Sequence, residues 1–196
     1  MRRKTGILGI VISLMLIFSG CDVSKELSSA YNITQCKYDY NSISNLTVSG
    51  MNLSSGISAT NVLKLTSILT GQANSIPMNF TLNMDVKNPN QSAAKMHGMQ
   101  YIISIDDIEF TTGSVNQTMN IAAGGKQTLP LTIGLDLATL MKSNSKTAVQ
   151  NIAKNFLGIG NSKSKVTVQL KPTFMIGSTP ITSPVYIPVS FNFGGK

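Results

Sequence analysis

Apolar and polar residues alternate along most of the chain, a pattern that predicts strands with one buried face. In the clearest run, polar residues separate Met78, Phe80, Leu82, Met84 and Val86. The same period of two recurs at 129–137, 166–176 and 185–193, and more weakly at 43–53 and 99–110. Successive strand residues point to opposite faces, so each segment is expected to place one face in a core and the other in water. The chain is therefore predicted to be mainly β.

Two kinds of interruption break this alternation. Between Ser145 and Leu157, apolar residues fall at helical spacing and glycines follow, which predicts an amphipathic helix. The apolar residues of the stretch 59–70 predict a second short helix, although its Ser and Thr residues have weak helix propensity. The weak strand at 43–53 is expected to be interrupted at Gly50, and a turn is expected at 106–107. Proline cannot donate to a sheet, so edges or bulges are expected at Pro130, Pro172 and Pro188.

The amino-terminal residues have the pattern of an export signal. Three positive charges at residues 2–4 precede a mostly apolar run at 6–18, which is too short to span a membrane. The sequence Phe18-Ser19-Gly20-Cys21 resembles the bacterial lipobox. That resemblance implies cleavage before Cys21 and lipid attachment to its thiol; two or three acyl chains would hold the protein at a membrane permanently. The alternative is an ordinary cleaved leader in which Cys21 has no special role.

These features divide the chain into three parts. Residues 1–20 are predicted to be a lipoprotein signal peptide, 21–30 a short polar tether, and 31–196 a single β domain. Cys36 is the only other cysteine, so a lipidated Cys21 leaves it without an intrachain disulfide partner. It lies in a strand-like stretch, and a buried packing role is predicted for it, with a reactive thiol as the alternative.

A family resemblance appears in the first half of the domain. The residues that carry it are Asp85-Val86-Lys87-Asn88-Pro89-Asn90, Met99-Gln100-Tyr101, Gly113 and the run Leu129 to Leu137. They resemble the water-stress and hypersensitive-response (WHy) domain of group-2 late embryogenesis abundant proteins, over residues 43–141. The resemblance implies an immunoglobulin-like or fibronectin-like antiparallel β-sandwich and a role in stress or desiccation tolerance, and it transfers no catalytic residue. Asn-Pro-Asn is also an ordinary way to end a strand.

Candidate chemistry is sparse. His97 is the only histidine, and its neighbours offer no metal-ligand spacing, so a loop or surface position is predicted. Asp106, Asp107 and Glu109 form the only acidic cluster, which lacks the pattern of a calcium loop and is read as a polar hairpin turn. No cofactor, metal or catalytic residue is predicted.

Positive charge is concentrated in the carboxyl-terminal third. The whole chain carries a formal net charge of +8, and residues 137–196 contain lysines but no acid. These lysines are a candidate basic patch for anionic lipid or acidic polysaccharide, with a solvated surface as the alternative. Both arginines lie in the leader, which argues against nucleic acid. The patch comprises Lys142, Lys146, Lys154, Lys163, Lys165 and Lys171.

The sequence thus favours a lipid-anchored protein of the bacterial cell envelope with a non-enzymatic binding or structural domain. Its partners would be the membrane, through lipidated Cys21, and an envelope protein or polysaccharide. The candidate binding loop is Asn88, Pro89 and Asn90, since strand-end loops are common contact surfaces. The alternatives are a stress or desiccation protectant, and an envelope hydrolase built from His97 and carboxylates such as Asp107.

Overall fold

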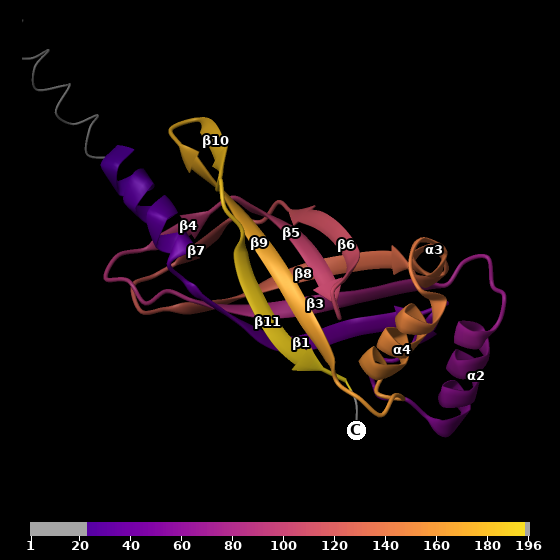
Figure 1. Ribbon diagram of the computed structural model, residues 1–196. Coiled ribbons are helices and arrows are strands. Elements are labelled where there is room, and N and C mark those ends of the chain that lie inside the picture. Colours follow the sequence, from indigo (N-terminus) through magenta and orange to yellow (C-terminus); the bar gives the residue numbers. More distant parts are fainter. Residues whose placement is uncertain (1–22, 195–196) are drawn as a thin grey trace, which may run out of the picture.

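The predicted strands and helices account for most of the molecule (Figure 1). The computed structural model describes residues 23–194, so the predicted signal peptide and Cys21 lie outside the described residues. The helices are α2 (Ala59–Thr70), α3 (Leu137–Ser143) and α4 (Lys146–Phe156), and residues 23–34 are also helical. The strands are β1 (Lys37–Val48), β2 (Met51–Asn52), β3 (Pro77–Lys87), β4 (Ala94–Met96), β5 (Gly98–Ile105), β6 (Ile108–Val115), β7 (Met119–Ile121), β8 (Lys126–Asp136), β9 (Ser164–Ile176), β10 (Thr179–Thr182) and β11 (Ile187–Phe193).

The first sheet has the antiparallel strand order β2-β1-β3-β8. The apolar face of β3 is buried, as its alternation predicts. A turn at residues 49–50 separates β1 from β2 where Gly50 was expected to interrupt the strand. Two register shifts interrupt the pairing of β1 with β3, one between Tyr40 and Ser42 and one between Ser44 and Thr47. Such bulges increase the local twist and bend the strand.

The second sheet has the order β10-β9-β5-β6, and β11 also pairs with β9. Asp106 and Asp107 both have positive φ and form the tight turn between β5 and β6, which confirms the predicted hairpin. The prolines lie at edges, as predicted: Pro130 on β8 and Pro188 on β11, both outer strands. Pro172 lies where β9 passes from its pairing with β11 to its pairing with β10.

The two sheets curl toward each other and enclose one apolar core. β1 approaches β11 on one side, where the Tyr40 and Phe191 rings stack at 4.4 Å, and β6 approaches β8 on the other. The predicted mainly β, antiparallel fold is confirmed. The arrangement is a curled half-barrel, however, and the immunoglobulin-like or fibronectin-like sandwich is not confirmed.

The helices α2, α3 and α4 gather at one end of the sheets (Figure 1). The predicted helices at 59–70 and within 145–157 are confirmed as α2 and α4. Gln150 of α4 donates a hydrogen bond to the Leu69 carbonyl near the end of α2. The sequence did not predict α3, because Leu137 continues the alternation of β8. Asp136 ends that alternation by capping the new helix: its carboxylate accepts hydrogen bonds from the amides of Ala138 and Thr139.

We expect Asp136→Ala to lower the free energy of unfolding by about 1–2 kcal/mol, the usual cost of removing a helix cap. The carboxylate also accepts hydrogen bonds from the Ile76 amide and the Ser75 hydroxyl. These bonds hold the pKa of Asp136 below its ordinary value of 3.8. The stabilisation is therefore present at neutral pH and is lost as the pH falls below about 4 toward the folded pKa. Urea unfolding of wild type and variant between pH 7 and pH 3 measures this, and the difference should shrink with acidity.

Asp136→Asn is the matched control, because it keeps a capping oxygen without the charge. It should retain most of the stability at pH 7. Equal stability of Asp136→Ala and wild type at pH 7 would contradict the capping role.

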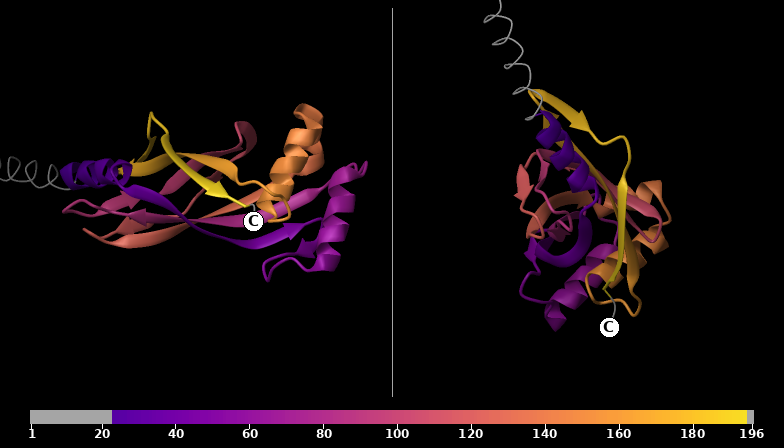
Figure 2. Two further views of the ribbon diagram at one scale, coloured as in Figure 1. Left: turned by 60° about the horizontal axis from the view of Figure 1, so that its bottom comes forward. Right: turned by 90° about the vertical axis from the view of Figure 1, so that its left-hand side faces the viewer.

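The amino-terminal end differs from the predicted tether at 21–30. Residues 23–34 are helical, and Ala30 and Ile33 are 3% and 0% exposed. This helical segment lies at the opposite end of the sheets from α2, α3 and α4 (Figure 2). Because these residues are helical and partly buried, the ordered domain starts closer to Cys21 than the polar sequence suggested.

No helix within residues 23–194 is both long and apolar enough to cross a bilayer.

Candidate functional site

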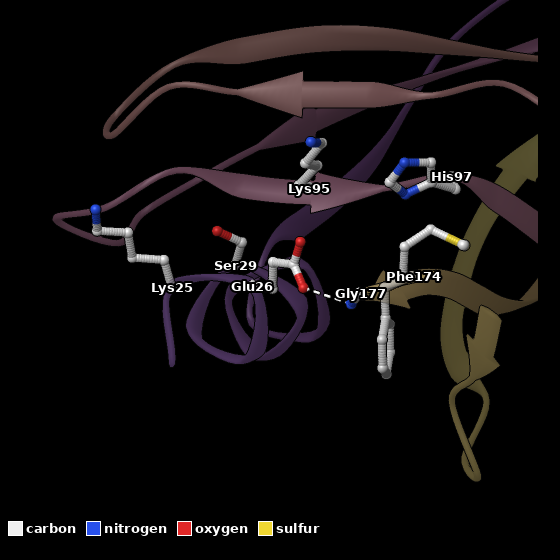
Figure 3. A pocket seen from close by; sticks show the side chains of 8 residues that line it. Lys25, Glu26, Ser29, Lys95, His97, Phe174 and Gly177 are labelled. Carbon is white, nitrogen blue, oxygen red and sulfur yellow. Dashed lines mark hydrogen bonds between the residues drawn. The ribbon is translucent and has the colours of Figure 1, made fainter. Parts of the chain in front are cut away.

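A hollow of about 580 Å³ lies between the amino-terminal helical segment, β4 and the end of β9 (Figure 3). Three chain segments distant in sequence supply its lining. Residues 25, 26 and 29 come from the helical segment, 95 and 97 from β4 and the residue after it, and 174, 175 and 177 from β9 and the turn that follows. The lining residues are Lys25, Glu26, Ser29, Lys95, His97, Phe174, Met175 and Gly177.

One hydrogen bond closes this hollow at the β9–β10 turn. The Glu26 carboxylate accepts a hydrogen bond of 2.6 Å from the Gly177 amide (Figure 3). Gly177 has a φ of 59°, a backbone conformation that favours glycine, so the turn can present its amide there at little cost. The bond holds the helical segment against the second sheet.

His97 lies between β4 and β5 with a fixed backbone and a partly buried side chain. Its amide donates a hydrogen bond of 2.7 Å to the Thr173 carbonyl of β9. Its Nδ1 is buried and has no hydrogen-bond partner among residues 23–194. The prediction of a loop position for His97 is confirmed, although the side chain is only half-exposed.

The polar groups of the hollow are of mixed charge. Lys25 and Lys95 form no ion pair with an acidic residue of the described chain, while Glu26 is bound to the turn. Within residues 23–194, no three His, Cys, Asp or Glu side chains come together as a metal site. The hollow therefore presents two ammonium groups, one imidazole and one carboxylate.

The hydrolase alternative was built from His97 and carboxylates such as Asp107. His97 and Asp107 lie at opposite ends of β5, and eight strand residues span about 25 Å. At the turn, the neighbouring Asp106 accepts a hydrogen bond from the Lys165 amide of β9. The structure thus does not bring this pair together.

The predicted binding loop has an internal role instead. Asn88 is 0% exposed, and its side-chain nitrogen lies 2.9–3.1 Å from the carbonyl oxygens of Ser92, Ile121 and Ala122. Its Oδ1 accepts hydrogen bonds from the amide and side chain of Asn90. Of the three loop residues, Pro89 alone is exposed. Asn88 is therefore unavailable to a ligand and organises the loop.

This loop also holds the amino-terminal helical segment. Asn90 donates a hydrogen bond of 3.2 Å to the Asn32 carbonyl, and the Asn32 side chain donates to Ser92 and Ala93. Asn32 is only 6% exposed. The surface predicted to contact a partner is thus partly covered by the chain itself.

The candidate basic patch is divided among several surfaces. Lys142 and Lys146 line one hollow beside α3 and α4, and Lys154 lines another with Asn151 and Asn155. Lys163 and Lys165 are exposed at the start of β9. Lys171 lies 5.0 Å from the centre of the Tyr186 ring, close to the other end of that strand. Only Lys142 and Lys146 are thus shown to share a hollow.

Cys36 packs in the core near this end, as predicted. It is 7% exposed, and its thiol lies 3.4 Å from the Asn32 carbonyl oxygen. Burial raises the pKa of the thiol to about 11, so it is almost entirely protonated and unreactive at neutral pH. Cys36 lies just before β1 rather than within a strand.

Comparison with known proteins identifies the domain. The sequence profile of the late embryogenesis abundant protein family matches residues 83–190, which is more than half of the chain. The chain belongs to this family. A search of curated proteins finds no match. The match begins within β3 and ends within β11, so it includes nearly all of the second sheet but only β8 and the end of β3 from the first sheet.

Three solved structures are similar to this late embryogenesis abundant chain. A crystal structure from Archaeoglobus fulgidus is 17% identical, covers 81% of this chain and 98% of its own, and has a TM-score of 0.39. A solution structure from Arabidopsis thaliana is 10% identical, with coverages of 63% and 74% and a TM-score of 0.40. The solution structure of a candidate late embryogenesis abundant protein is 13% identical, with coverages of 97% and 87% and a TM-score of 0.38.

The structure of the late embryogenesis abundant domain explains the residues at positions 101 and 113, which are two of those that suggested the family. Tyr101 of β5 lies directly opposite Gly113 of β6, and a Cβ at position 113 would overlap the Tyr101 ring. The Tyr101 hydroxyl donates a hydrogen bond of 3.0 Å to the Thr132 carbonyl of β8. Glycine at 113 thus lets one tyrosine connect the two sheets.

The sequence did not predict the hollow between the helical segment and β9. Lys25, Glu26 and Ser29 were assigned to a tether, and no spacing relates them to Lys95 or residues 174–177. One signal was present: apolar Ala30 and Ile33 lie one helical turn apart, which is typical of a helix face that packs.

Proposed function

We propose that this chain is a lipid-anchored protein of the bacterial cell envelope, in which the late embryogenesis abundant domain is a non-enzymatic binding or structural module. The lipobox-like sequence ending at Cys21 supports the anchor. Family membership, with no catalytic residue to transfer, supports the non-enzymatic role.

The observation that carries this proposal is the position of the first described residues. Val23 follows Cys21 by two residues, and the helical segment described from Val23 onward lies at one end of the sheets (Figure 2). Two extended residues span at most about 7 Å. An acylated Cys21 would therefore hold this end near the membrane, while α2, α3 and α4 at the other end would face an envelope partner such as a protein or polysaccharide.

Family membership also favours a second candidate, a protectant of the envelope during drying or other stress. The WHy resemblance and its immunoglobulin-like scaffold belong to this candidate. A deletion strain and the same strain carrying the gene would be compared for survival after desiccation. Lower survival of the deletion strain supports the protectant role, and equal survival argues against it.

We expect Cys21→Ala to abolish incorporation of a palmitate analogue and to release the protein from the membrane fraction. The substitution removes the thiol that would carry the lipid. Metabolic labelling followed by fractionation measures both effects. Cys36→Ala is the matched control and should keep full label, because Cys36 is buried in the domain. Unchanged label in Cys21→Ala would refute the anchor.

A further inference from the structure

Three apolar side chains form an uncovered stripe on the amino-terminal helical segment. Val23, Leu27 and Tyr31 follow one another at intervals of four residues, which places them on one helical face. Their exposed fractions are 49%, 57% and 64%. The face that carries Ala30 and Ile33 is buried against the domain. The segment is thus apolar on two faces, and the domain covers one of them.

A second group of exposed apolar side chains lies at the same end of the molecule. Ile181 is in β10, and Val185 and Tyr186 follow that strand. The bond between Glu26 and Gly177 ties the helical segment to the turn that precedes β10. Both segments lie at the end where the described chain begins (Figures 1 and 2). Of the large apolar side chains exposed within residues 23–194, only Leu63 of α2 lies outside these two groups.

The residue types at this end are those that proteins use to contact the surface of a lipid bilayer. Tyr31 and Tyr186 each combine an apolar ring with a polar hydroxyl, a residue type enriched at membrane interfaces. Lys25 is exposed on the same segment without an acidic partner, and Lys171 lies against Tyr186. Such lysines can bury their methylenes while the ammonium groups meet anionic head groups.

The short distance along the chain between Cys21 and the stripe favours a membrane as the surface that covers it. The stripe begins two residues after Cys21, so acyl chains on that residue would bring the bilayer surface within about 7 Å of Val23. We propose that Val23, Leu27 and Tyr31, together with Ile181, Val185 and Tyr186, form a second membrane contact that lies in the interfacial region beside the anchor. This inference rests on the proposed lipid anchor. The contact would fix the orientation of the domain, and the hollow with Lys25, Lys95 and His97 would open close to the head groups.

The first test measures where the helical segment lies in the acylated protein. Leu27→Cys and Leu63→Cys would each be labelled with an environment-sensitive fluorophore, in protein reconstituted in vesicles of phosphatidylethanolamine and phosphatidylglycerol. Leu63 is the matched control, since it is an exposed leucine on a helix at the other end. The wild-type protein checks that buried Cys36 is not labelled. We expect a blue shift and quenching by spin-labelled lipid at position 27, and neither at position 63.

The second test removes the anchor and asks whether the apolar end binds lipid by itself. The mature chain from residue 21 with Cys21→Ser would be sedimented with the same vesicles. We expect measurable binding that falls about tenfold in Leu27→Ser, because burial of one leucine side chain contributes about that factor to partitioning. Leu63→Ser should bind as strongly as the Cys21→Ser parent. Circular dichroism would confirm that each variant is folded.

The outcomes separate this inference from the proposed anchor. Palmitate label with a water-exposed probe at position 27 overturns the membrane contact and leaves the anchor standing. Absence of label, with vesicle binding that Leu27→Ser weakens, refutes the anchor and supports the contact. A blue shift at position 27 before vesicles are added, with dimers in sedimentation velocity, assigns the stripe to a second copy of the chain and overturns the contact. Equal vesicle binding by Leu27→Ser and its parent also overturns it.

Discussion

Replacing Phe156 by alanine is expected to lower the free energy of unfolding by about 3–5 kcal/mol, the usual cost of truncating a buried phenylalanine. Phe156 is 4% exposed at the end of α4. Its ring lies 5.0 Å from that of Phe80 in β3 and 4.8 Å from that of Phe193 in β11. It therefore joins a helix to a strand of each sheet, and its removal leaves a cavity where these three elements meet. Equilibrium unfolding in urea, followed by circular dichroism, measures the loss.

Leu63→Ala is the control for this prediction. Leu63 lies on α2 and is 74% exposed, so its truncation should change the free energy of unfolding by less than about 0.5 kcal/mol. A loss below about 1 kcal/mol in Phe156→Ala would show that the three elements do not depend on this ring.

Asn88→Ala is expected to lower the free energy of unfolding by about 2–4 kcal/mol, because it removes a buried side chain that makes several hydrogen bonds. The substitution leaves the carbonyl oxygens of Ile121 and Ala122 without their side-chain donor and removes the acceptor for Asn90. Asn88→Asp should also destabilise the domain at neutral pH, since its carboxylate would face these carbonyl oxygens. Urea unfolding gives the stability of both variants.

Asn41→Ala provides the comparison for Asn88. Asn41 is exposed, and its side chain donates one hydrogen bond, to Asp85. It should lose less than about 0.5 kcal/mol. If Asn88→Ala were as stable as Asn41→Ala, the loop would not depend on the buried amide.

The alternation of apolar residues predicted the strands well, because burial of one face requires that pattern. β3, β5, β8 and β9 lie within or close to the expected stretches, and α4 lies within the predicted helix between Ser145 and Leu157. The period of two does not show which strands pair or how far a sheet curls. Those features depend on the β1 bulges and on contacts between distant strands, such as the stacking of Tyr40 on Phe191.

The candidate site was less predictable than the fold. Asn88 and Asn90 are polar and follow a strand, so they suggested an exposed loop; their burial depends on the covering helical segment and on carbonyl groups of residues 121–122. The lysines of residues 142–171 looked like one patch because sequence proximity says little about position on a folded surface. Residues 21–30 were assigned to a tether because polar residues separate the few apolar ones there.

The prolines at the sheet edges affect whether copies of the protein can associate through their strands. Pro130 lies in the outer strand β8, and Pro188 in the outer strand β11. Neither has an amide hydrogen to offer a strand of a neighbouring molecule. Edge-to-edge pairing between copies, the first step of many aggregates, is therefore interrupted at both positions.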